Sequence, residues 1–306
     1  MKQIRLTRRD LCGSLAATVC LRTAFALDPK RGTGPLLWVA TRGKATVYLF
    51  PFGEAKDESW FSARVKSAFA SSSELWLELG PPPPKGEIDA LYEELGHDPT
   101  QSMFDALTPP VRARALQYMS ELDIPRDSIQ TMRPWRAYYA FVTAFDKKYH
   151  HSSGFTKVAQ PQLPPDWVLG GQAAKDHKPI HYEIMMIDWI RKLAATSNQI
   201  QSDYLDWLFD FFDDEKKGLN RTRFDWMQGH LNSRAIDDMR TRLPALYEIM
   251  DGERNRWWAR QVGELLSRGG TYFVAIGQNH FADSRGIPTL LTEQAVVPAS
   301  DLKVIS

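Results

Sequence analysis

The chain contains very little cysteine. Cys12 and Cys20 are its only two cysteines, and both lie in the first 26 of its 306 residues. Without that segment the protein has no thiol nucleophile and no disulfide, so an exported form must rely on its core alone. The sequence also lacks a G-x-x-x-x-G-K-S/T phosphate loop and a G-x-S-x-G turn, which argues against a P-loop NTPase and an α/β-hydrolase.

The N-terminal apolar stretch is short. Residues 11–21 fall well below the roughly 20 residues that a membrane-spanning helix needs. They follow the paired Arg8 and Arg9 and precede the small-residue site Ala24-Phe25-Ala26. This order is typical of a secretory signal and resembles the twin-arginine export type. We predict a signal in residues 1–26, a single domain over residues 27–306 with no transmembrane segment, and a periplasmic or secreted location.

The chain also has no large excess of positive or negative charge. The chain has 38 Lys and Arg against 37 Asp and Glu, and five of the basic but only one of the acidic residues lie in residues 1–26. The remainder is slightly acidic, so nucleic acid is not expected as a partner. The hydrophobic content of 43% is ordinary for a globular protein, and a chain of this length can bury a large core.

Apolar spacing predicts the main elements. Residues 35–50 are typical of a β-hairpin, and residues 73–80 of a strand with Glu74, Trp76 and Glu78 on one face. Helices are predicted over residues 59–72, 108–123, 134–149, 202–218 (with Ser202 or Asp203 as N-cap), 242–270 and 286–294. A buried strand over residues 271–277 lies between the last two helices, and a closing strand ends the chain. Strand, glycine turn and helix in this order predict an α/β fold with its site at strand ends.

Gly277-Gln278-Asn279-His280 is the sharpest short motif. The glycine turn places His280 at the end of a buried strand, where an imidazole could bind a metal or act as a general base. A structural histidine is an equal alternative. Pro179 separates His177 from His181, which excludes a helical metal-binding pair there.

Arg254 and Trp258 are four residues apart and share one face of a predicted helix. From the residues alone, we interpret them as a solvent-exposed charged stripe beside a buried tryptophan. The alternative is an arginine that orients a carboxylate or an anionic substrate group.

Several segments together resemble the TraB/GumN/PrgY family and the related TIKI, ChaN-like and EreA-like proteins. They are PLLWVATRGKATVYLF, SSELWLELG, MRPWRAYYAF and DGERNRWWARQVGELLSRGGTYFVAIGQNHFADSRG, and the resemblance spans roughly residues 34–298. It implies a central mixed β-sheet flanked by helices and built from two pseudo-symmetric halves, each with a G-x-x-H turn. TIKI relatives are regarded as metal-dependent proteases, whereas most bacterial GumN-like members have no established activity. The resemblance places the catalytic positions at Glu78, Glu183, Arg254 and His280.

The first G-x-x-H turn departs from the family pattern. This chain reads YLFPFGEAK, so Glu54 replaces the histidine if no gap is introduced, and Lys56 replaces it if Gly53 matches the glycine. A glutamate could serve as an oxygen ligand for a hard cation, but a protonated lysine would repel one.

Two functions follow from the resemblance. The first is a metal-dependent hydrolase, with a peptidase as one option, that uses Glu54, Glu78 and His280 as ligands for a divalent ion such as Mn, Co or Zn. The second is an inactive member that binds a peptide, a polysaccharide or a partner protein through the same cleft.

Overall fold

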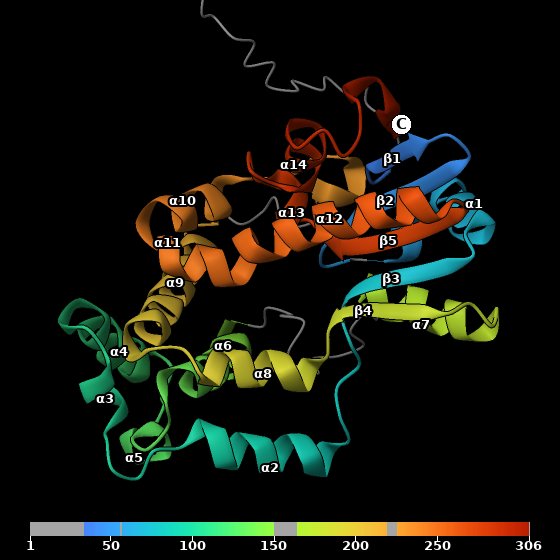
Figure 1. Cartoon of the computed structure of the whole chain (residues 1–306). Helices are drawn as coiled ribbons and strands as arrows, with labels where there is room; N and C mark the ends of the chain where they lie inside the picture. Colours follow the sequence, from blue (N-terminus) through green and yellow to red (C-terminus); the bar gives the residue numbers. More distant parts are fainter. Residues whose placement is uncertain (1–33, 56, 150–163, 219–224, 306) are drawn as a thin grey trace, which may run out of the picture. The chain divides into compact units, whose positions relative to one another are not determined.

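Six strands form one mixed sheet in the part of the chain that the structure describes. The computed structural model describes residues 34–55, 57–149, 164–218 and 225–305, so the predicted signal lies outside the described residues. The strands lie in the spatial order β4-β3-β5-β2-β1-β6 (Figure 1). Their bounds are β1 Leu37–Arg42, β2 Ala45–Phe52, β3 Glu74–Leu79, β4 Ile180–Ile184, β5 Thr271–Gly277 and β6 Leu302–Ile305.

The sheet has an antiparallel side and a parallel side. β1 pairs antiparallel with β2 and with β6, and the β1–β2 turn contains Gly43 at a φ of 59°, a conformation that favours glycine. β2, β5, β3 and β4 pair in parallel, so their carboxyl ends meet at one edge. The predicted hairpin and the predicted α/β fold with a mixed sheet are confirmed. The relation between two similar halves stays a prediction.

Helices cover both faces of this sheet. α12 contacts β1 and β2 and shares a core with α13 and α14, while α1 and α7 share a core on the opposite face (Figure 1). Along β5, Tyr272, Val274 and Ile276 belong to the first core, and Phe273 and Ala275 to the second. β5 is therefore buried on both faces, which explains its unbroken apolar sequence.

The other helices form cores of their own. α3 to α6 pack with α9, α10 and α11, and α2, α6 and α8 form a smaller cluster. The helix bounds are α1 Ala63–Ser71, α2 Lys85–Gly96, α3 Met103–Ala106, α4 Pro109–Glu121, α5 Arg126–Ile129, α6 Pro134–Tyr149, α7 Pro165–Lys175, α8 Met186–Ala194, α9 Asn198–Lys216, α10 Arg234–Arg242, α11 Pro244–Tyr247, α12 Glu253–Arg268, α13 Asn279–Ala282 and α14 Ile287–Glu293. None of the described helices has the length and apolar character needed to cross a bilayer.

Three predicted helices differ from the observed ones. The helix predicted over residues 59–72 begins only at Ala63, where the Ser62 side chain caps α1. α9 begins at Asn198 because the Ser197 side chain accepts a hydrogen bond from the backbone N–H of Ile200. The prediction that Ser202 or Asp203 caps this helix is wrong, since Ser202 is buried within α9 and accepts a hydrogen bond from the Thr108 backbone N–H. The helix predicted over residues 242–270 is divided into α11, a π-helical turn at Glu248–Gly252, and α12.

Candidate functional site

The candidate site lies at the carboxyl edge of the parallel strands. Glu78 lies near the end of β3, Glu183 is on β4, and His280 follows β5 on α13. Arg254 reaches them from the first turn of α12. The four predicted catalytic residues are therefore brought together, at the strand ends where α/β proteins commonly bind ligands.

Arg254 is the centre of this cluster. Its Nε donates to Oε1 of Glu183 at 2.7 Å and its Nη2 donates to Oε2 at 2.8 Å, so the ion pair is bidentate. Nη2 also donates to Oε1 of Glu78 at 2.8 Å. Arg254 is only 8% exposed, so the interpretation as a solvent-exposed stripe is wrong. The neighbouring Trp258 is buried as predicted, and its Nε1 donates to Glu183 at 2.7 Å.

Glu78 is held on both carboxylate oxygens. Oε1 accepts from Arg254, and Oε2 accepts from the backbone N–H of Gly277 at 2.7 Å. Burial raises the pKa of Glu78, but the charge of Arg254 and the hydrogen bond and charge of His280 lower that pKa by more. The net result is a pKa well below the usual range. A Cβ at Gly277 would lie 2.9 Å from Oε2, so a glycine lets the strand end approach this carboxylate.

His280 lies between two carboxylates and one amide. Its Nδ1 lies 2.7 Å from Oδ1 of Asn255 and 3.5 Å from Oδ1 of Asp251, and its Nε2 lies 3.6 Å from Oε1 of Glu78. The Asn255 Nδ2 donates to the carbonyl of Arg285, which fixes Oδ1 as the atom that accepts from the imidazole. Nδ1 therefore carries a proton.

The charge of His280 follows from these neighbours. Burial lowers its pKa, but the hydrogen bond and charge of Glu78 and the charge of Asp251 raise that pKa by more, so the net shift is upward. The arrangement favours the imidazolium, which presents an N–H toward each carboxylate.

The sequence interpretation missed Asp251 and Asn255. Both are buried. Asp251 lies three residues before Arg254, and Asn255 directly follows it. With Trp258 they form a 251, 254, 255, 258 spacing, which is the pattern of one helical face. That spacing was the signal that could have identified them.

Asp166, in the first turn of α7, was also missed. Its Oδ1 is buried without a hydrogen-bond partner. Burial and then the charge of Glu78 raise the pKa of Asp166 to about 6. No local motif marks this aspartate in the sequence.

The altered first turn lies beside β5. Phe52 pairs with Gly277, and the carbonyl of Phe52 accepts from the backbone N–H of Gln278 at 2.6 Å. The carbonyl of Glu54 accepts from Nε1 of Trp226 at 2.7 Å. Lys56 lies outside the described residues, so its predicted orientation stays a prediction.

The described residues do not fit a divalent ion at Glu78 and His280. No group of three His, Cys, Asp or Glu side chains among them is placed to hold a metal ion. Both oxygens of Glu78 are already hydrogen-bonded, and the Arg254 guanidinium lies 2.8 Å from Oε1, where its charge would repel a cation. The metal site of Glu54, Glu78 and His280 is not supported by this arrangement and stays a prediction.

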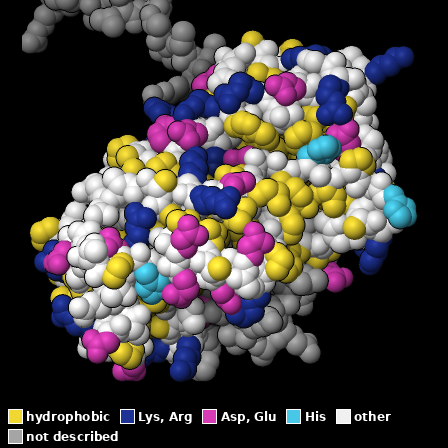
Figure 2. Space-filling model, turned by 60° about the horizontal axis from the view of Figure 1, so that its bottom comes forward, with side chains coloured by type: hydrophobic (Ala, Val, Ile, Leu, Met, Phe, Trp, Pro, Cys, Tyr) yellow, Lys and Arg dark blue, Asp and Glu magenta, His cyan; other side chains and the backbone are white. Residues whose placement is uncertain are grey.

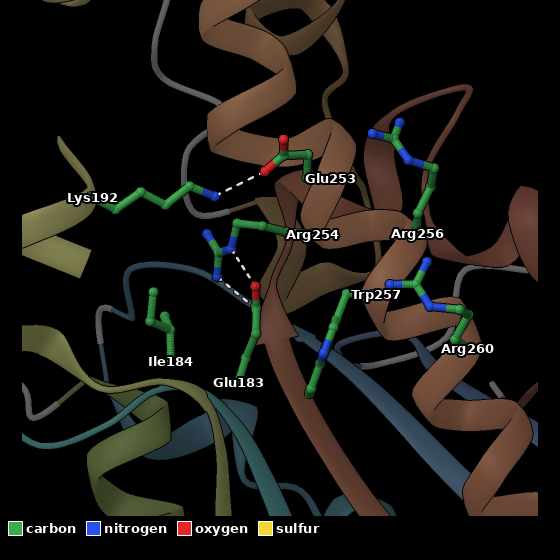
Figure 3. A pocket seen from close by; sticks show the side chains of 8 residues that line it. All are labelled: Glu183, Ile184, Lys192, Glu253, Arg254, Arg256, Trp257 and Arg260. Atoms are coloured by element: carbon green, nitrogen blue, oxygen red, sulfur yellow. Dashed lines mark hydrogen bonds and ion pairs between the residues drawn. The ribbon is translucent and has the colours of Figure 1, made fainter. Parts of the chain in front are cut away.

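A pocket opens beside the ion pair of Arg254 and Glu183. Its volume is about 380 Å³, and Figure 3 shows side chains from β4, α8 and α12 around it. Arg254 and Glu183 form part of its wall, so a ligand in the pocket would contact the cluster directly.

Comparison with protein families matches residues 36–298 to the TraB/PrgY/gumN family. Comparison with curated proteins and with solved structures gave no match. The match covers most of the chain, including all four predicted catalytic residues, and agrees with the span of the resemblance. The chain belongs to the TraB/PrgY/gumN family.

Proposed function

We propose that this chain is an exported ligand-binding member of the TraB/PrgY/gumN family. It binds a peptide- or polysaccharide-related ligand in the pocket beside Arg254 and does so without a catalytic metal. The observation that carries this proposal is the position of Arg254, which donates to both Glu78 and Glu183.

Electrostatics support this proposal. A metal-dependent site needs carboxylates whose charge is left for the cation. Here a buried guanidinium is hydrogen-bonded to both glutamates. Burial lowers the pKa of Arg254, but the two carboxylates raise that pKa by more. A divalent ion would have to displace Arg254 or lie beside it, and both cost energy in a buried site. The cluster is thus suited to fixing the wall of a pocket.

A metal-dependent hydrolase is the second candidate. One observation favours it, because Asp251 and Glu78 each place an oxygen within 4 Å of a ring nitrogen of His280. A carboxylate beside an imidazole is the usual arrangement for proton transfer.

Metal analysis of the purified protein separates the two functions. The wild type, His280→Ala and Glu78→Ala are loaded with Mn, Co or Zn, dialysed and measured by mass spectrometry. Glu74→Ala is the matched control, since Glu74 is on the same strand and face as Glu78 but pairs with Arg268. We expect no difference in metal content among the four proteins. One equivalent of metal in the wild type and in Glu74→Ala, lost in the other two, would overturn the proposal.

Export is tested separately. Replacing Arg8 and Arg9 with lysine is expected to retain the protein in the cytoplasm of a bacterium with twin-arginine transport, because that pathway reads the arginine pair. Unchanged appearance in the periplasmic fraction would contradict twin-arginine export.

A further inference from the structure

The pocket beside Arg254 contains more positive than negative charge. Four of its lining side chains are cations and two are carboxylates: Lys192, Arg254, Arg256, Arg260, Glu183 and Glu253. The face drawn in Figure 2 mixes acidic and basic side chains without a large field of one sign.

Two of the cations are matched by the two carboxylates. Nζ of Lys192 lies 3.0 Å from Glu253, and Arg254 forms its bidentate pair with Glu183. These pairs are the dashed interactions in Figure 3. They leave Arg256 and Arg260 as the source of the excess charge.

Arg256 and Arg260 are the two guanidinium groups that do not pair with a carboxylate of the pocket lining. Arg256 pairs with Glu248, which is outside the lining, and its side chain is 45% exposed. Arg260 is exposed and has no hydrogen bond or ion pair with any residue that the structure describes. A guanidinium has five donors, so both arginines retain donors for a ligand.

The spacing of these two arginines lowers the stability of α12. They are four residues apart and share one helix face, where two like charges destabilise a helix by about 0.2–0.5 kcal/mol. Trp257 lies between them in sequence and lines the same pocket as a half-buried indole. An anion bound by both guanidinium groups would remove their repulsion, and the indole offers an apolar surface beside it.

We propose that this pocket binds a ligand that carries a carboxylate or phosphate group. Arg256 and Arg260 bind the anionic group, and an apolar or ring-shaped part of the ligand lies against Trp257. This inference rests on the proposed function, because it names the chemical class of the ligand in the same pocket.

Calorimetric titration at low salt tests the inference. The probes are inorganic phosphate, phenyl phosphate, acetate and benzoate. We expect at least one anion to bind, the ring-bearing member of its pair to bind more tightly, and 0.3 M NaCl to weaken binding. Comparing the two phosphate probes with the two carboxylate probes shows which anionic group the pocket binds.

Variants assign the binding to the pocket. Arg260→Gln and the double variant Arg256→Gln/Arg260→Gln should weaken the tightest probe at least 10-fold, and Trp257→Ala should remove the preference for the ring. Arg268→Gln is the matched control, since it removes the same charge from the same helix at a residue that does not line the pocket. Circular dichroism checks that each variant is folded.

Two results would overturn the inference. One is a wild type that binds none of the probes at 10 mM, and the other is a double variant that binds as tightly as Arg268→Gln does. Neither result alters the metal analysis, so failure of the anion site and failure of the proposed function are read from different measurements.

Discussion

Arg254 and Glu183 form a two-bond ion pair between α12 and the edge strand β4, with distances of 2.7 and 2.8 Å. The same guanidinium also donates a hydrogen bond to Glu78 on β3, and its Cζ atom lies 5.2 Å from the ring centre of Trp189 on α8. One side chain therefore joins two strands and two helices at the carboxyl edge of the sheet. The free energy of unfolding should depend strongly on it.

Arg254→Gln tests this dependence. Removing one partner of a buried ion pair leaves an uncompensated charge and costs about 3–5 kcal/mol. Here Glu183 and Glu78 would both lose their cation, so we expect a loss in that range by urea unfolding. Arg268→Gln breaks a pair on the same helix whose arginine is half exposed, and should cost less than about 1 kcal/mol. Equal losses in the two variants would contradict a central role for Arg254.

The protonation of His280 depends on Glu78. Burial alone would lower the pKa of His280, and Glu78 is the first group that raises it. Glu78→Gln should therefore lower this pKa below its usual range, as followed by NMR titration of the imidazole. Glu74→Gln is the control, because Glu74 is on the same strand but pairs with His181. An unchanged His280 pKa in Glu78→Gln would show that Asp251 holds the proton instead.

The sequence predicted the sheet edge and, through the family resemblance, the four residues that meet there, but it did not predict how these residues contact one another. Alternation along residues 73–80 correctly placed Glu74, Trp76 and Glu78 on one face, and the apolar run before Gly277 correctly marked β5. Arg254 was predicted to be exposed because helical periodicity shows only the near neighbours of a residue. Its partners are 71 and 176 residues away in the chain, on strands whose approach depends on the whole fold.

Short elements were missed for a different reason. β4 alternates apolar and polar residues over Ile180–Ile184, but it is only five residues long and has no fully buried residue, so this short pattern was not recognised as a strand. α2 follows four prolines, which can continue neither a strand nor a helix and so obscure the start of the helix in the sequence. Pro84 precedes the first residue of α2, and a proline there does not disturb the hydrogen bonds of the helix.

Asp166 gives the protein a pH dependence of opposite sign to that of Glu78. A carboxyl whose folded pKa is raised favours folding at low pH, and this advantage is lost as the pH rises to the folded pKa of about 6. The lowered pKa of Glu78 instead adds stability above the usual glutamate pKa, and that stability is lost as the pH falls.

Asp166→Asn isolates the first effect. Between pH 5 and pH 7.5 the wild type should lose about 1–2 kcal/mol of unfolding free energy relative to this variant. The measurement is urea unfolding at both pH values, with the exposed Asp127→Asn as the control for charge removal. The prediction fails if the difference between wild type and Asp166→Asn is the same at both pH values.

Gly286 controls the packing behind His280. A Cβ at this position would lie 2.5 Å from the carbonyl oxygen of His280 and 2.8 Å from that of Asp283. Both atoms belong to the backbone, so the clash can be relieved only by moving the segment that carries the imidazole. We expect Gly286→Ala to destabilise the protein by about 1–3 kcal/mol, as overpacking does in cores. It should also shift the NMR signals of His280.

Gly86→Ala is the matched comparison for this substitution. Gly86 lies in α2, and a Cβ there would meet no atom within 4 Å. Alanine is favoured over glycine in a helix by about 1 kcal/mol, so Gly86→Ala should be neutral or stabilising. If the two variants unfold at the same urea concentration, the carbonyl groups around Gly286 can move freely. In that case the position of His280 is set by Asn255 and Glu78 alone.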